Sequence, residues 1–115
     1  MDTAYAKLDL PFSNALSVLS TVISLNQEGW YVVGGGLKAL GTDHGNPSIE
    51  GADVWYCSDE HIVFSQEEDH PALSLGKLIR ATPAHVDPTV AYHAQMHIIS
   101  DDAVLEPWPI DLRGW

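Results

Sequence analysis

The hydrophobic residues of this chain fall into short runs separated by turn-forming residues. A run rich in Val, Thr and Ile covers residues 15–25, and four β-favouring residues occupy 30–33 after a turn at 27–29. Similar runs lie at 53–57, 61–64, 75–80 and 103–105. β-Branched and aromatic residues in runs of this length favour strands, and the turn at 58–60 predicts that 53–57 and 61–64 form a hairpin.

Residues 90–99 alternate between two faces in the manner of one further strand. His93 and His97 then share a face but stand two pleats apart, too far to hold one ion, so we interpret them as polar residues on a solvated sheet face. Pro11 argues against a helix through the first dozen residues, and 37–40 predicts one short helical turn.

The spacing of turn signals predicts the fold class. They recur every 8–12 residues, and no long amphipathic helix is visible. The expected fold is mainly β, a small antiparallel β-barrel or sandwich of about seven to eight short strands. No repeat or linker divides the chain, so we expect a single β domain over residues 1–115.

Composition and charge narrow the function classes. Of the 115 residues, 45% are hydrophobic, which is ordinary for a folded protein. The net charge of −11 argues against nucleic-acid binding and favours attraction of small cations. Cys57 is the sole cysteine, so the chain cannot form an internal disulfide. The N-terminus does not resemble a signal peptide, and the apolar stretch 15–25 is too short to cross a bilayer; a cytoplasmic protein without membrane contact is expected.

Two motifs are candidates for function. Gly34-Gly35-Gly36 follows a predicted strand without the spacing of a phosphate-binding loop, so we interpret it as a flexible bulge or a close backbone approach. His85-Val86-Asp87 has an i, i+2 spacing that on an extended backbone directs both side chains to the same side. An imidazole and a carboxylate so placed could share a divalent ion, with the other coordination positions left to water or substrate. The His-x-Asp pattern is very common, so spacing alone favours an ordinary polar pair over a metal site.

Several short segments together carry a resemblance to a known family. They occur in a specific order across the chain: Met1-Asp2-Thr3-Ala4-Tyr5, residues 19–24, residues 36–40 with Thr42-Asp43, Ser58-Asp59-Glu60-His61, residues 83–90, and Trp108-Pro109-Ile110 with Arg113-Gly114. In these segments the chain resembles the C-terminal domain of the D-threonine aldolase and D-serine dehydratase family, whose members are pyridoxal-phosphate enzymes of the alanine-racemase-like fold.

The resemblance implies a site. It implies that His85 and Asp87 bind a divalent metal. D-serine dehydratases tend to have cysteine at the position of Asp87. A carboxylate suits manganese or magnesium, and zinc also accepts it, so the ion stays open. In such an enzyme the metal orients the substrate β-hydroxyl and pyridoxal phosphate stabilises the carbanion. Lys38 and Thr89 lie on matching segments, His93 closely follows one, and all three are expected to line the site; no catalytic or cofactor-binding residue is assigned.

The resemblance also implies what the chain lacks. The family's barrel domain needs about 250 residues, and Lys7, Lys38 and Lys77 fall outside the part that carries the cofactor lysine. We therefore expect pyridoxal phosphate only in a full-length parent enzyme, and no lyase activity from this chain alone.

The surface that faces a barrel in the family should be exposed here. Sheet edges or an apolar patch near Trp108 and Trp115 predict a homo-oligomer, with a barrel domain or a full-length relative as a further partner. Two alternatives are a non-enzymatic β interaction module and a small metalloenzyme, which would need His93 or His61 as a third ligand.

Overall fold

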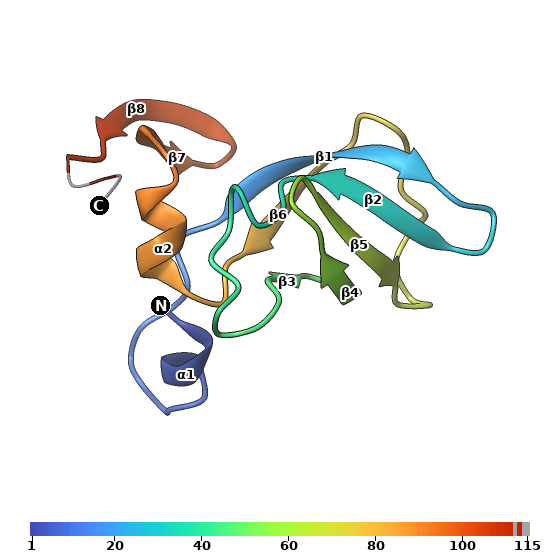
Figure 1. Cartoon of the computed structure of the whole chain (residues 1–115), viewed down its shortest axis with the longest axis horizontal. Helices are drawn as coiled ribbons and strands as arrows, with labels where there is room; N and C mark the ends of the chain where they lie inside the picture. Colours follow the sequence, from blue (N-terminus) through green and yellow to red (C-terminus); the bar gives the residue numbers. More distant parts are fainter. Residues whose placement is uncertain (112, 114–115) are drawn as a thin grey trace.

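The computed structural model describes residues 1–111 and 113, and most of its regular structure is β (Figure 1). In chain order the elements are α1 (Thr3–Ala6), β1 (Val18–Leu25), β2 (Trp30–Gly34), β3 (Ser48–Ile49), β4 (Ala52–Cys57), β5 (His61–Gln66), β6 (Leu78–Thr82), α2 (Val86–Ala91), β7 (Gln95–Ser100) and β8 (Ala103–Pro109). The predicted fold class, a mainly β protein with a small antiparallel barrel, is confirmed. The two helices are far too short to span a bilayer.

Six strands close into an antiparallel barrel in the order β1-β2-β5-β4-β3-β6, with β6 pairing back to β1. The predicted hairpin of 53–57 with 61–64 is present as β4 and β5, with Cys57 opposite Ile62. The turn predicted at 27–29 joins β1 to β2, and Gly29 has the positive φ of 86° that such a turn favours.

The barrel interior is filled by inward-facing apolar side chains. On β2 the buried residues alternate, as expected for a strand with one face toward a core. Leu40, from the turn after β2, adds to this interior and is 1% exposed. The core cluster comprises Val22, Tyr31, Val33, Leu40, Ile49, Ile62, Phe64 and Ala81, and the half-buried Cys57 packs against it.

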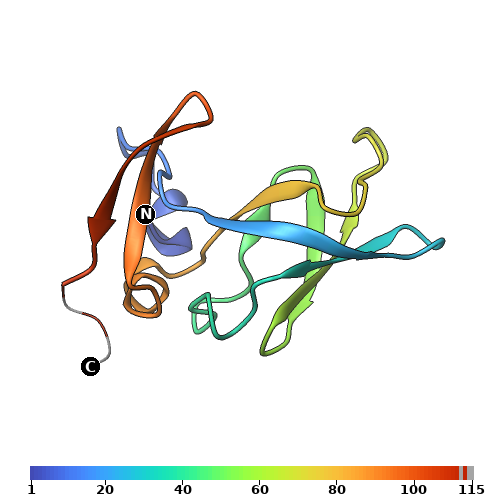
Figure 2. The same cartoon turned by 90° about the horizontal axis from the view of Figure 1, so that it is seen from above.

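A second part of the molecule lies beside the barrel (Figure 2). It consists of α2 and the β7–β8 hairpin. Asp101 and Asp102 form the hairpin turn with φ values of 48° and 66°, the conformation required by a two-residue turn. The last strand runs to Pro109, beyond the predicted 103–105.

The single strand predicted for 90–99 is wrong. Residues 86–91 form α2, and the strand begins only at Gln95. The physical reason is Pro88, which lies in the first turn of α2, where its missing N–H needs no partner. Asp87, also in that turn, has its carboxylate near the positive end of the helix dipole.

The expectation that no helix runs through the first dozen residues is confirmed, because α1 has only four residues and ends before Pro11. One further expectation needs correction. The strand predicted at 75–80 begins at Leu78, because Ser74 to Lys77 form a turn closed by the Lys77 N–H and the Ser74 carbonyl. Trp115, part of the predicted apolar patch, lies outside the described residues.

Candidate metal site

His85 lies where three segments meet: the start of α2, the loop after residue 40, and the N-terminal segment. Its backbone is extended, with φ −131° and ψ 122°, and pairs with Gly41 in an isolated antiparallel bridge. Its side chain is 20% exposed. The imidazole is therefore held in a partly buried position but remains open to solvent on one side.

The Asp43 carboxylate makes the closest polar contact with this imidazole. His85 Nδ1 lies 2.7 Å from Asp43 Oδ2. This hydrogen bond stabilises the ionised carboxylate and holds the pKa of Asp43 below its ordinary value. Asp43 itself is 58% exposed, so its charge remains well solvated.

Asp2 and His44 bring further potential donor atoms close to His85. Ligand atoms of Asp2, His44 and His85 all lie within 4.8 Å of one another. Asp2 Oδ1 accepts a hydrogen bond of 2.7 Å from the Val86 backbone N–H, which ties the N-terminus to the first turn of α2. Nitrogen and carboxylate oxygen donors are the set that Zn²⁺ and Mn²⁺ accept, so the residues present fit a divalent ion.

Asp87, the second predicted ligand, lies on the first turn of α2 and is exposed. The expectation that 85–87 form one extended segment is wrong, because the backbone changes from extended at His85 to helical from Val86. Asp87 does not join the cluster of Asp2, His44 and His85. An ion shared by His85 and Asp87 remains a prediction.

The other residues expected to line the site have different surroundings. Thr89 is 1% exposed; its hydroxyl donates to the His85 carbonyl at 2.7 Å and accepts from the Gly41 N–H at 2.9 Å. His93 is not on a strand, contrary to the prediction, and its Nε2–H donates to the Ala39 carbonyl at 2.9 Å. Both residues thus anchor α2 to the loop after β2. Neither His93 nor His61 joins the cluster around His85.

The three lysines of the chain lie on its surface. Lys7, Lys38 and Lys77 are all exposed. Lys38 is paired with Glu60, and its side chain is 67% exposed.

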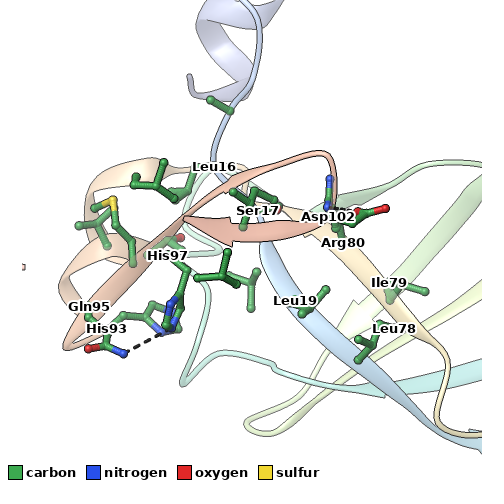
Figure 3. A pocket seen from close by; sticks show the side chains of 18 of the residues that line it. Leu16, Ser17, Leu19, Leu78, Ile79, Arg80, His93, Gln95, His97 and Asp102 are labelled. Carbon is green, nitrogen blue, oxygen red and sulfur yellow. Dashed lines mark hydrogen bonds and ion pairs between the residues drawn. The ribbon is translucent and has the colours of Figure 1, made fainter. Parts of the chain in front are cut away.

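A separate groove lies between the barrel and the β7–β8 hairpin (Figure 3). Its volume is about 870 Å³, and its lining is mainly apolar. Leu19 and Leu78 line its barrel side, and His97 and Gln95 come from the hairpin, joined by a 3.3 Å contact between Nε2 atoms. His85 does not line this groove, so the groove and the candidate metal site are distinct.

Sequence reasoning assigned no role to Asp2, Asp43 or His44. Asp43 and Asp2 are 42 and 83 residues away from His85, so no local spacing could indicate their contact. The signal available was indirect: both residues fall on segments that carry the family resemblance.

Comparison with known proteins gives the family. The family described as "Putative serine dehydratase domain" matches residues 15–99, well over half of the chain. The chain belongs to this D-serine dehydratase family. The match includes Asp43, His44, His85, Asp87 and Thr89, so the family region contains most of the candidate site.

Relatives of this D-serine dehydratase family member are considerably longer. Over 109 residues the chain is 35% identical to a D-threonine aldolase of Arthrobacter sp, covering 92% of the chain and 29% of that protein. It is 37% identical over 106 residues to the 3-hydroxy-D-aspartate aldolase of Paracoccus denitrificans, covering 90% of the chain and 27% of the relative.

The solved structures agree with these relatives. The crystal structure of D-threonine aldolase from Filomicrobium marinum superposes with a TM-score of 0.84 at 34% identity, covering 95% of the chain and 31% of that protein. The chain thus spans less than a third of the proteins that it matches.

Proposed function

We propose that this chain is the metal-binding C-terminal domain of a pyridoxal-phosphate-dependent D-amino acid lyase that cleaves or dehydrates D-3-hydroxyamino acids. The resemblance to the aldolase and dehydratase family supports the reaction class, and two relatives are aldolases by name. The observation that carries the proposal is the partly buried imidazole of His85, placed among carboxylates in a strongly acidic protein.

In this proposal His85 and Asp87 hold the divalent ion. Manganese, magnesium or zinc would polarise the substrate's β-hydroxyl when bound. His85 contributes a neutral ring nitrogen, and Asp87 contributes a charged oxygen from the first turn of α2. The remaining positions are left to water and substrate, as in other catalytic metal sites.

The pyridoxal phosphate belongs to the longer parent enzyme. The resemblance assigns it to a barrel domain, which would be the partner of this chain or continuous with it. On its own the chain is expected to bind metal weakly and to have no lyase activity. Supplying a matching barrel in trans and assaying aldehyde release from D-threonine tests that part of the proposal.

Metal binding is testable on the chain itself by titrating Mn²⁺ and Zn²⁺ into metal-free protein in a calorimeter. We expect one site whose binding is lost in His85→Ala and strongly reduced in Asp87→Ala. The matched controls are His97→Ala and Asp53→Ala, which remove exposed residues of the same types on β7 and β4.

The outcomes separate the two functions that remain. Loss of binding in the His85 and Asp87 variants, with normal binding by both controls, supports the lyase domain. Absence of binding by the folded wild-type chain would contradict it and favour a non-enzymatic β interaction module.

A further inference from the structure

We propose that Asp43 is a positioning residue that fixes the tautomer and the orientation of His85, so that Nε2 is the ring nitrogen presented to the cation. The inference rests on the proposed function, in which His85 binds the metal, and extends it to a residue with no assigned role. Three features of the structure carry it: the hydrogen bond to Nδ1, the stacking of His44, and the backbone that holds the Asp43-His44 dipeptide in place.

The hydrogen bond determines which nitrogen is free. His85 Nδ1 lies 2.7 Å from Asp43 Oδ2, and an ionised carboxylate can only accept, so Nδ1–H is the donor. A neutral imidazole protonated at Nδ1 has its lone pair on Nε2. A carboxylate on the far nitrogen is also the usual partner of a metal-binding histidine, because it orients the ring and increases the basicity of the ligating nitrogen.

The ring of His44 stacks on one face of the His85 ring and does not act as a second metal ligand. The two ring centroids are 3.9 Å apart, and the planes are within 4° of parallel. A metal lies close to the plane of the imidazole that binds it, so two parallel stacked rings cannot both direct a lone pair at one ion. His44 therefore restricts rotation of the His85 ring in this arrangement, although it lies within the same cluster.

The backbone keeps the dipeptide at this distance. Gly41 forms a bridge with His85, and its N–H donates to Thr89 Oγ1 at 2.9 Å. A Cβ on Gly41 would lie 2.3 Å from Cγ of Pro88, so only glycine allows this close approach. The loop that carries Asp43 and His44 is thus fixed against α2 by contacts that involve neither side chain.

Asp43 differs from the other carboxylates near His85. Its Oδ2 is used by the imidazole, and Asp43 does not belong to the group of Asp2, His44 and His85. Asp2 Oδ1 accepts a hydrogen bond from the Val86 N–H, which leaves Oδ2 for other partners. Asp43 therefore orients the metal ligand His85 and is not itself a metal ligand.

The test compares Asp43→Ala, Asp43→Asn and the charge-matched control Asp53→Ala. Two quantities are measured: the ¹⁵N chemical shifts of the His85 ring in metal-free protein at a pH where the imidazole is neutral, and the affinity for Mn²⁺. We expect wild type and Asp53→Ala to show the Nδ1–H tautomer and equal affinity. In Asp43→Ala the tautomer shifts toward Nε2–H and the affinity falls about 10- to 100-fold.

Asp43→Asn is the conservative variant that separates hydrogen bonding from charge. Its side-chain oxygen can still accept from Nδ1–H, so the tautomer is retained and the affinity lies between those of wild type and Asp43→Ala. Asp43 is exposed, so these variants are expected to fold, and their amide spectra verify it.

Failure of this inference is distinguishable from failure of the proposed function. If wild type binds Mn²⁺ through His85 while Asp43→Ala keeps both the Nδ1–H tautomer and the wild-type affinity, the positioning role is overturned and the metal site stands. If wild type itself does not bind Mn²⁺, the proposed function is contradicted, and the positioning of a metal ligand is contradicted with it.

Discussion

Lys38 and Glu60 form an exposed ion pair between the turn that follows β2 and the turn between β4 and β5. The hydrogen bond and charge of Lys38 lower the pKa of the Glu60 carboxyl, and Glu60 raises the pKa of the Lys38 amine. Both side chains are well solvated, so the pair contributes little to the free energy of unfolding. The pKa of Glu60 nevertheless reports whether these two turns lie close together.

We predict that Lys38→Met raises the pKa of Glu60 toward the ordinary value of a glutamate. Since the folded-state pKa is depressed, the contribution of the pair is present above the unfolded-state pKa and is lost as the pH falls through the folded value. The measurement is an NMR titration of the Glu60 carboxyl carbon. Lys77→Met is the control, and an unchanged Glu60 pKa in Lys38→Met would show that the pair does not form.

Gly36, in the turn after β2, shows how closely two elements approach. A Cβ at this position would lie 2.0 Å from the Ser58 carbonyl oxygen and 2.7 Å from the His61 nitrogen. Both are backbone atoms that are fixed by the β4–β5 hairpin and cannot move away cheaply. At Gly36 the close backbone approach, one of the two interpretations of the triple glycine, is confirmed.

Gly36→Ala should therefore destabilise the barrel by about 2–3 kcal/mol, in the range of other overpacked sites. Gly34→Ala is the matched control, because a Cβ there meets nothing within 4 Å. Urea unfolding monitored by tryptophan fluorescence gives both free energies of unfolding. Equal stabilities of the two variants would contradict the steric argument.

Strands and hairpins that are bounded by turn-forming residues were predictable from the sequence. The hairpins follow from turn residues between β-favouring runs, as at 58–60 and at Asp101-Asp102. The helix α2 was not predicted for two reasons. A proline such as Pro88 normally interrupts a helical pattern, and the alternation over 90–99 mimics a strand. A proline in a first helical turn and a proline at a strand end look alike without knowledge of the neighbouring backbone.

The candidate site was predictable only in part. His85 was found because its motif and the family resemblance both indicate it, and the structure adds the neighbours that hold it. Asp2, Asp43 and His44 reach His85 through tertiary contacts, such as the Gly41 bridge and the hydrogen bond from Val86 to Asp2. Contacts between segments so distant in sequence leave no periodic pattern.

The whole molecule combines a strongly acidic surface with exposed apolar side chains beside the groove. Leu19, Leu78 and Val104 line it and are each more than half exposed, and Trp108 on β8 is also exposed. Exposed apolar surface of this kind favours association. We propose that it receives a second copy of the chain, which makes the protein a homo-oligomer.

Light scattering at micromolar concentrations tests the association. We predict a mass of at least twice the 12.6 kDa of one chain. Leu19→Asp with Leu78→Asp should reduce the mass, since they place charge on the groove face, whereas exposed Leu8→Asp in the N-terminal segment should not. A monomeric wild-type profile across the concentration range would contradict the prediction.

The central claim is that the start of α2 is the cation site of this protein. The most direct measurement is paramagnetic broadening of amide NMR signals by substoichiometric Mn²⁺. The account predicts broadening centred on residues 85–89 and on the loop at 41–45, and its disappearance in His85→Ala. Broadening that instead centres on the acidic loop at 67–69 or the turn at 101–102, and that persists in His85→Ala, would contradict it.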